Sequence, residues 1–215
     1  MDEILFIDKP SGITSFDVIR RLRKRLNIKK IGHAGTLDPL ATGLLIIGVG
    51  NGTKQLEKFM KLPKEYEVLV EFCKVSNTYD ADGVIEPGPE PLREISRDVF
   101  NAELKIFIGE IEQIPPAFSA KKIQGQRAYE PARRGEKVEM KPNKISIFAI
   151  EVMEWNWPFV RLRVRCSKGT YIRSLAHDLG FALGCGGYVK ELRRTAIGEC
   201  RVETAERMSL LDTTF

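Results

Sequence analysis

The run Gly32–Leu45 constrains this chain more than any other, because it places a single acid, Asp38, in a loop of small and apolar residues. Glycines in the run allow tight turns and close approach of the backbone to a ligand, and Pro39 fixes the turn directly after the acid. The apolar segment at 44–49 predicts a buried strand that anchors the loop. A carboxylate held on such a loop suits a nucleophile or a general base. The alternative is an Asp that caps its own turn, which is the commoner case for an isolated Asp-Pro pair.

The length and composition predict a globular protein of one domain or two closely associated subdomains. The chain has 215 residues, of which 43% are hydrophobic and 29% are charged, as is ordinary for a soluble protein. No apolar run is long enough to span a membrane and the N-terminus lacks a signal-peptide pattern, so we expect a cytoplasmic protein. The four cysteines lack metal-ligand spacing, which predicts reduced, mostly buried thiols and no zinc site: Cys73, Cys166, Cys185 and Cys200.

Basic residues gather in two stretches, and this distribution points to a polyanionic partner more strongly than the formal net charge of +5 does. A solvated charged face is the alternative to nucleic-acid binding. The first stretch is Arg20, Arg21, Arg23, Lys24, Arg25, Lys29 and Lys30, and the second is Lys121, Lys122, Arg127, Arg133, Arg134, Lys137, Lys141 and Lys144.

Hydrophobic periodicity predicts a mixed α+β fold, because helices and strands follow one another without regular alternation. A helix capped by Thr14 or Ser15 has an apolar stripe at helical spacing, and its other faces carry the first basic stretch. Further helices are expected at 96–107 and 170–183, and strands at 5–7, 44–49, 66–72, 145–155 and 159–166, of which the last two are expected to form a hairpin.

Two later segments are rich in basic residues, and one of them is a regular strand whereas the other has little regular structure. The strand expected at 159–166 alternates cleanly, so Arg161, Arg163 and Arg165 share one face, which is either a solvated surface or a polyanion contact. The region 113–143 has two adjacent prolines and little apolar periodicity, which predicts a long irregular excursion. Such loops are uncommon in compact domains unless they bind something, and a disordered insertion is the alternative.

Several single residues give weaker signals. His33 precedes Asp38 and can orient a substrate or hydrogen-bond the loop, whereas His177 is expected either to lie at the surface or to serve packing. Tyr66 begins an apolar strand, where core packing is usual and stacking on an RNA base is the functional alternative. Arg173 either belongs to a capped helix start or pairs with an acid from another part of the chain.

Five sequence motifs occur in one order along nearly the whole chain, and together they resemble the TruB-type pseudouridine synthase family. Five long motifs in the right order are far more specific than any one of them alone. The motifs are Ile7–Ser15, Gly32–Leu45, Gln113–Lys121 with Gly125, Tyr129, Ala132 and Arg133, then Cys166–Arg173 and Leu192–Thr195.

The resemblance implies a pseudouridine synthase fold, with a mixed, largely antiparallel sheet flanked by helices and an active-site cleft. It implies isomerisation of uridine to pseudouridine in RNA, without cofactor or metal. On the matching positions, the expected catalytic residues are Asp38, Tyr66, Arg173 and Tyr171, with Arg173 paired to Asp38. The substrate-binding residues expected from the same motifs are His33, Lys9, Lys121, Leu192 and Arg193.

The resemblance also implies a partner and a domain organisation. The implied partner is the T-arm of tRNA, with the uridine at position 55 as the target of a monomeric enzyme. Members of the family usually carry a further C-terminal RNA-binding module, and only residues 196–215 follow the last motif here. We therefore expect one catalytic domain over residues 1–215 without that module, in which 113–143 contacts RNA.

Other functions stay open on sequence grounds. The catalytic subunit of a guide-RNA particle, as in the dyskerin-type branch, is disfavoured by the missing module, through which that branch docks guide RNA. A non-catalytic RNA-binding or RNA-folding protein is disfavoured by the presence of Asp38, Tyr66 and Arg173. A glycoside hydrolase would need a second carboxylate to pair with Asp38, and the sequence offers no convincing one.

Overall fold

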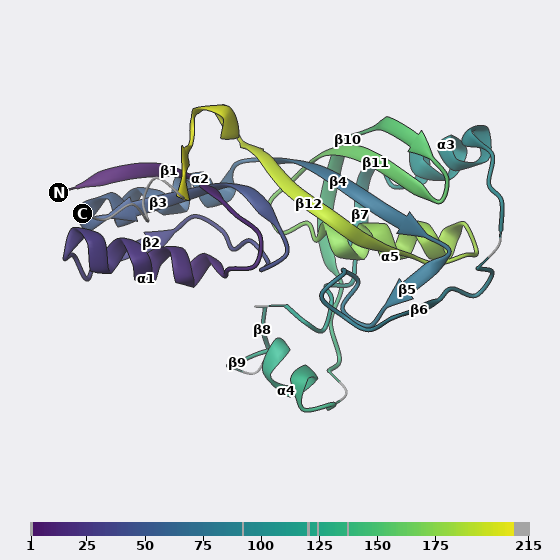
Figure 1. Ribbon diagram of the computed structural model, residues 1–215, viewed down its shortest axis with the longest axis horizontal. Helices are drawn as coiled ribbons and strands as arrows, with labels where there is room; N and C mark the ends of the chain where they lie inside the picture. Colours follow the sequence, from purple (N-terminus) through teal and green to yellow (C-terminus); the bar gives the residue numbers. More distant parts are fainter. Residues whose placement is uncertain (1, 92, 120, 124, 137, 209–215) are drawn as a thin grey trace. The chain divides into compact units, whose positions relative to one another are not determined.

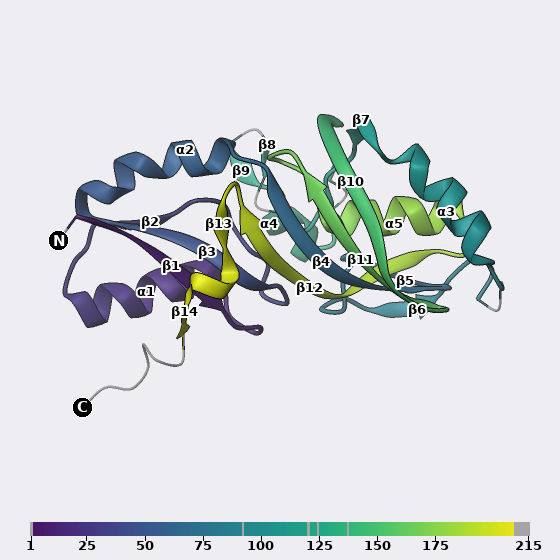
Figure 2. The ribbon, with the colours of Figure 1, turned by 90° about the horizontal axis from the view of Figure 1, so that it is seen from above.

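The computed structural model describes residues 2–91, 93–119, 121–123, 125–136 and 138–208. The chain divides into two compact units (Figure 1, Figure 2). Unit 1 takes the described residues up to Glu67 and from Leu192 onward, and unit 2 takes Val68–Glu191. The boundaries fall inside two long strands, β4 (Lys64–Phe72) and β12 (Gly187–Ile197), so each of these strands contributes residues to both units.

The sheet of unit 1 has the strand order β14-β1-β3-β12. The long strands β1 (Glu3–Lys9) and β3 (Thr42–Val49) pair antiparallel along their lengths. β14 (Glu206–Arg207) pairs parallel with β1, and β12 pairs parallel with β3. The short strands β2 (Ile31–His33) and β13 (Cys200–Arg201) add antiparallel to β3 and β12 respectively.

Two helices of unit 1, α1 (Ser15–Leu26) and α2 (Leu56–Lys61), contact β2 and β3 respectively (Figure 2). Thr14 begins α1 with a capping box, in which its hydroxyl accepts from the Asp17 amide and the Asp17 carboxylate accepts from the Thr14 amide. The apolar stripe of α1 is buried as its spacing predicts: Val18, Ile19 and Leu22. Short 3-10 turns follow β3 and β13, namely η1 (Gly50–Gln55) and η2 (Val202–Thr204).

The sheet of unit 2 has the strand order β12-β4-β11-β10-β7. β10 (Asn143–Asn156) and β11 (Phe159–Cys166) form the expected hairpin, and β7 (Gly109–Gln113) pairs antiparallel with β10. The alternation of β11 is confirmed, because its apolar side chains are buried: Val160, Leu162, Val164 and Cys166. β5 (Lys74–Ser76) and β6 (Ile85–Pro87) form a separate antiparallel pair.

Helices α3 (Arg97–Ile106) and α5 (Ile172–Ala182) of unit 2 contact each other. Ser96 caps α3 by accepting from the Val99 amide. An aromatic cluster completes the core on the α3 side, with Phe100 edge-on to both Phe72 and Trp155 and with Trp157 stacked on Phe72.

The region 113–143 is more regular than its composition predicts. It contains a small hairpin, β8 (Lys122–Ile123) with β9 (Gln126–Arg127), and the short helix α4 (Tyr129–Arg133). Main-chain bonds hold these pieces together, with the Ala128 amide donating to the Lys121 carbonyl and the Tyr129 amide to the Ser119 carbonyl. Lys137 of the second basic stretch lies outside the described residues.

A buried carboxylate on β4 ties three strands of unit 2 together. Glu71 is 3% exposed and accepts from the Tyr188 hydroxyl at 2.5 Å, from Lys190 at 2.9 Å and from Lys74 at 2.7 Å. Burial raises the pKa of Glu71, but hydrogen bonds from these three donors outweigh it and hold the pKa at about 2. The ionised form of Glu71 is therefore part of the folded structure.

The expected α+β class and largely antiparallel sheet are confirmed, and the cysteines are free and mostly buried, as expected. Each expected helix and strand is present, with ends shifted by a few residues. The structure also contains elements that the periodicity did not predict, among them helix α2, the long strand β12 and several short strands. Among the helices that the structure describes, none is long and apolar enough to cross a membrane.

Candidate active site

The Asp38 loop joins β2 to β3 in unit 1, and its conformation needs glycine. Gly35 and Gly43 have φ values of 90° and 101°, which side chains rarely adopt. A Cβ on Gly43 would also lie 2.3 Å from the Arg194 carbonyl oxygen, because β12 passes directly beside β3 there. Asp38 itself is half-buried, between the buried Leu37 and the exposed Pro39.

Side chains from the N-terminal segment support this loop on both sides of Asp38. The Ser15 hydroxyl accepts from the Leu37 amide at 2.8 Å and donates to the Leu37 carbonyl at 3.1 Å. The Pro39 carbonyl accepts from the Gly12 amide at 2.9 Å and from the Lys9 ammonium at 3.3 Å. Neither neighbour of Asp38 can move without breaking these bonds, so the loop is preorganised.

Lys9, which the motifs assign to substrate binding, is fully buried in unit 1. Its ammonium donates to the carbonyls of Pro10 and Ile13, each at 2.8 Å, as well as to Pro39. These contacts give Lys9 a supporting position beneath the loop, and a direct contact with substrate stays a prediction.

Other residues from the motifs are also placed in unit 1. His33 is the last residue of β2 and is half-buried, opposite Ile47 of β3. Tyr66 is half-buried near the start of β4. Leu192 on β12 is 7% exposed, and its carbonyl accepts from the Thr42 hydroxyl at 3.4 Å. Their catalytic and binding roles stay predictions.

Arg173, the second residue of α5, is 4% exposed in unit 2 and has an acidic partner from a distant segment, as one of the two interpretations predicted. Its guanidinium lies 3.4 Å from the Asp80 carboxylate and donates to the carbonyls of Thr78 and Phe118, each at 3.0 Å. The pairing with Asp38 stays a prediction, because Asp38 belongs to the other unit. The sequence interpretation missed Asp80 as a partner.

Tyr171 is held through its backbone immediately before α5. The side chain of Gln113, which is 1% exposed, accepts from the Tyr171 amide at 2.8 Å and donates to its carbonyl at 3.0 Å. The Ser174 hydroxyl donates to the Ile114 carbonyl at 2.7 Å. The start of α5 is thus bound to the end of β7, where the 113–143 region begins.

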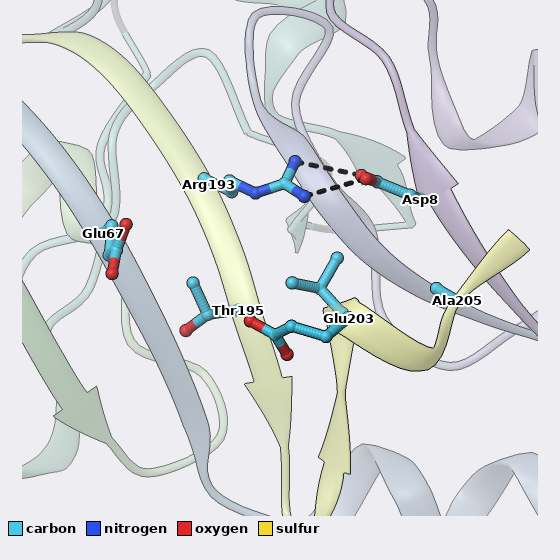
Figure 3. Close-up of a pocket in the computed structure, with 7 residues that line it drawn as sticks. Asp8, Glu67, Arg193, Thr195, Glu203 and Ala205 are labelled. Atoms are coloured by element: carbon cyan, nitrogen blue, oxygen red, sulfur yellow. Dashed lines mark hydrogen bonds and ion pairs between the residues drawn. The ribbon is translucent and has the colours of Figure 1, made fainter. Parts of the chain in front are cut away.

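Arg193 lines a polar cavity of about 280 Å³ in unit 1 (Figure 3). Both of its terminal nitrogens donate to the Asp8 carboxylate, at 3.0 and 2.8 Å. The other lining residues are Glu67, Thr195, Val202, Glu203 and Ala205. This cavity does not include the Asp38 loop, and the predicted contact of Arg193 with substrate stays untested by this geometry.

The two groups of arginines and lysines behave differently. On β11, Arg161 pairs with Glu154 and Glu191, and Arg163 pairs with Glu151, so much of that charge is neutralised locally. On and after α1, Arg20 pairs with Asp17, but most of the first basic stretch is exposed: Arg20, Arg21, Lys24, Arg25, Lys29 and Lys30. The exposed face of α1 is therefore the better candidate for a polyanion contact.

The second basic stretch is only partly described. Lys121 is half-buried, and its ammonium donates to the Asn143 side chain at 2.7 Å and to the Lys141 carbonyl at 3.3 Å. Arg134 is exposed and pairs with Glu136.

In the described part of the chain, no group of three or more His, Cys, Asp or Glu side chains is placed to hold a metal ion.

His177 and Asp178 are adjacent residues of α5 in unit 2, and both are half-buried. The His177 ring stacks on Tyr79 with ring centroids 3.8 Å apart, which confirms packing, one of the two roles expected for it. Burial lowers the pKa of His177 and raises the pKa of Asp178 to about 6. Unlike Glu71, Asp178 is therefore held in an environment that disfavours its charge.

Comparison with known proteins tests the family assignment that the five motifs imply. The model of the TruB family pseudouridylate synthase N-terminal domain matches residues 23–172, and the model of the tRNA pseudouridylate synthase B C-terminal domain matches residues 173–213. A tRNA pseudouridine synthase B of Bacteroides fragilis is 45% identical, over 94% of this chain and 88% of that protein. Another from Aquifex aeolicus is 48% identical, over 95% of this chain and 71% of that protein.

Solved structures show the same relationship. A chain in the crystal structure of a Cbf5-Nop10-Gar1 complex matches with a TM-score of 0.73 and 30% identity, over 97% of this chain and 53% of that chain. A chain in the structure of an H/ACA RNP bound to a substrate RNA containing 2′-deoxyuridine matches with a TM-score of 0.71 and 29% identity. This chain spans about half the length of either of these. The family implied by the five motifs is thus confirmed, and the chain belongs to the TruB family of pseudouridylate synthases.

Proposed function

We propose that this protein isomerises uridine to pseudouridine in tRNA. The observation that carries the proposal is the half-buried Asp38 on a loop whose neighbouring residues are hydrogen-bonded on both sides, in a chain 45% identical to a tRNA pseudouridine synthase B. A reaction that breaks and re-forms bonds at one nucleoside is accelerated by a catalytic group held in a fixed position, and a carboxylate can serve as that group.

The reaction must break the N-glycosidic bond, turn the base and re-form the bond through carbon. Asp38 either attacks the nucleoside or removes a proton from the sugar, and both routes use its ionised form. Tyr66 stacks on the freed uracil while the base turns. In other proteins, alanine substitution shows that such a stacking contact contributes about 1–3 kcal/mol per base to binding. Arg173 and Tyr171, set by Asp80 and Gln113, complete the catalytic group as the motifs imply.

The substrate reaches the site through phosphate contacts. The exposed basic residues on and after α1, together with Lys121 and the region 113–143, supply positive charge for an RNA backbone. Such contacts position the RNA, while contacts to the base select it. A uridine in a folded loop must be flipped out at a cost of a few kcal/mol, which is repaid by stacking and hydrogen bonds in the site.

The target that fits this family best is the uridine at position 55 in the T-arm of tRNA, modified by a cytoplasmic monomer that needs no cofactor. The second candidate is catalysis within a guide-RNA particle. It is favoured by the TM-scores of 0.70 to 0.73 with chains from Cbf5 complexes and an H/ACA RNP. The two candidates differ in whether the protein alone acts on tRNA.

The test is to incubate the purified protein with an unmodified tRNA transcript and to map pseudouridine chemically. We expect modification at position 55 by the wild type without added guide RNA, and none by Asp38→Asn, which preserves the size of the side chain but removes its charge. A wild type that modifies RNA only when a guide RNA is added would favour the second candidate. Undiminished activity of Asp38→Asn would show that another group performs the chemistry.

A further inference from the structure

Arg194 on β12 links the two sides of the Asp38 loop. Its guanidinium is buried, with the residue only 1% exposed. Nε donates to the Leu44 carbonyl at 2.8 Å, Nη1 to the Thr36 carbonyl at 3.4 Å and Nη2 to the Gly35 carbonyl at 3.3 Å. Gly35 and Thr36 precede Asp38 and Leu44 follows it, so one side chain joins both limbs of the loop. All of these residues belong to unit 1.

The charge of Arg194 has no structural explanation based on ion pairing. Over the described ranges of the chain, its polar contacts are these three main-chain carbonyls, and no carboxylate pairs with it. A buried cation must be compensated by hydrogen bonds, and an apolar side chain of similar size often packs at least as stably. An arginine at this position is therefore better explained by what its planar fork of donors holds than by stability alone.

The backbone is shaped so that the guanidinium can reach across the loop. Arg194 lies opposite Gly43 in the parallel pairing of β12 with β3. Gly43 has no side chain to keep β12 away, since a Cβ there would lie 2.3 Å from the Arg194 carbonyl oxygen. The position of a Cβ on Gly35 is 3.8 Å from Nη1, so this limb of the loop rests directly against the guanidinium.

We propose that Arg194 is a positioning residue for pseudouridine formation, which sets the backbone between Gly35 and Leu44 and thereby the orientation of Asp38. This inference rests on the proposed function. Ser15 and Lys9 hold the residues directly beside Asp38, and Arg194 holds the two limbs from which those residues extend. Lysine would keep the charge but has one ammonium in place of a fork, so it cannot reproduce bonds to both limbs.

The test compares Arg194→Lys and Arg194→Met with Leu22→Ala. Leu22 is buried on α1, so its truncation lowers stability without removing a bond to the loop. For each protein we would measure the single-turnover rate of pseudouridine formation at saturating tRNA transcript, the Kd for that transcript and the Tm. Rates are compared well below the lowest Tm.

We expect the rate of Arg194→Lys to fall about 100-fold with Kd unchanged, because small displacements of a reacting group have effects of this size. Arg194→Met should lose more, and Leu22→Ala should keep its rate despite a lower Tm. A wild-type rate in Arg194→Lys, an equal loss of rate in Leu22→Ala, or a weakened Kd with an unchanged saturating rate would each overturn the proposal.

Amide hydrogen exchange separates this proposal from the proposed function. If the wild type forms no pseudouridine, the proposed function fails, and the exchange of the amides from Gly35 to Ala41 then decides the role of Arg194. Faster exchange of these amides in Arg194→Lys but not in Leu22→Ala supports positioning of the loop. Unchanged exchange in the lysine variant would overturn it.

Discussion

Two buried arginines organise two regions of this protein, and they are satisfied in different ways. Arg194 in unit 1 donates to three main-chain carbonyls around the Asp38 loop. Arg173 in unit 2 donates to two carbonyls and also lies 3.4 Å from the carboxylate of Asp80. The first region is held by neutral acceptors, whereas the second is held by a charge pair.

The two kinds of acceptor predict different sensitivities to mutation and to pH. Carbonyl acceptors do not titrate, so the support of the Asp38 loop depends on backbone shape rather than on pH. A buried ion pair is sensitive to the loss of either partner, because the other is left as an uncompensated charge. We therefore expect unit 2 to respond to charge changes and the Asp38 loop to respond to changes of shape.

The largest effect is expected from Arg173→Met. It leaves the Asp80 carboxylate, 4% exposed, without this guanidinium, and should lower the free energy of unfolding by about 3–5 kcal/mol. Urea denaturation of the two proteins at neutral pH measures the difference. The double variant Arg173→Met/Asp80→Asn should recover part of the loss, and a double variant no more stable than the single one would contradict the charge-pair explanation.

The lowered pKa of Glu71 predicts that the protein loses stability in acid. Its pKa is lowered from 4.5 to about 2 in the folded protein, so its contribution is complete above pH 4.5 and is lost as pH falls toward 2. The shift corresponds to about 3 kcal/mol. Denaturation curves of the wild type and Glu71→Gln should differ at pH 6 and converge near pH 2, and a difference that does not depend on pH would refute this.

The raised pKa of Asp178, in the same unit, predicts the opposite dependence of stability on pH. Its pKa is raised from 3.8 to about 6, so its ionised form costs stability as pH rises from about 4 through 6. Because Asp178 is partly solvated, we expect Asp178→Asn to stabilise the protein by only about 1–2 kcal/mol at pH 8. The gain should vanish at pH 4, as thermal unfolding at the two pH values would reveal.

Ser15→Ala should have the smallest effect on stability and tests the neutral region. It removes both bonds to Leu37, beside Asp38, and should lower the free energy of unfolding by about 1 kcal/mol at every pH between 5 and 8. The single-turnover rate should fall as well, because the loop loses one support. Thr14→Ser, which keeps the capping hydroxyl of α1, serves as a control, and an equal fall in its rate would argue against a specific effect on the loop.

Much of the fold could be predicted from local patterns. The apolar stripe of α1, the alternation of β11 and the hairpin it forms with β10 depend on periodicity that is written in neighbouring residues. β12 could not be predicted in this way. Its adjacent charged residues, Arg193 and Arg194, break the alternation, and the burial of Arg194 depends on carbonyls more than 140 residues away in the chain.

The residues of the candidate site also differ in whether the sequence could identify them. The motifs locate Asp38, Tyr171 and Arg173, because each lies in a run of residues with a recognisable order, and the family resemblance adds Tyr66. Their supports carry no such signal. Gln113 and Asp80 gain their roles only when β7 and the segment after β5 meet the start of α5.

The family, the α+β class and the acid that we expect to do the chemistry can be inferred from the amino-acid sequence, since these depend on motifs and on local periodicity. How the Asp38 loop is held, and which acid lies beside Arg173 in unit 2, follow from the folded chain alone. A buried cation must find acceptors, and those acceptors come from whichever segments the fold brings next to it. Arg194 has no assigned role in the sequence analysis, and it supports the Asp38 loop because β12 packs against Gly43.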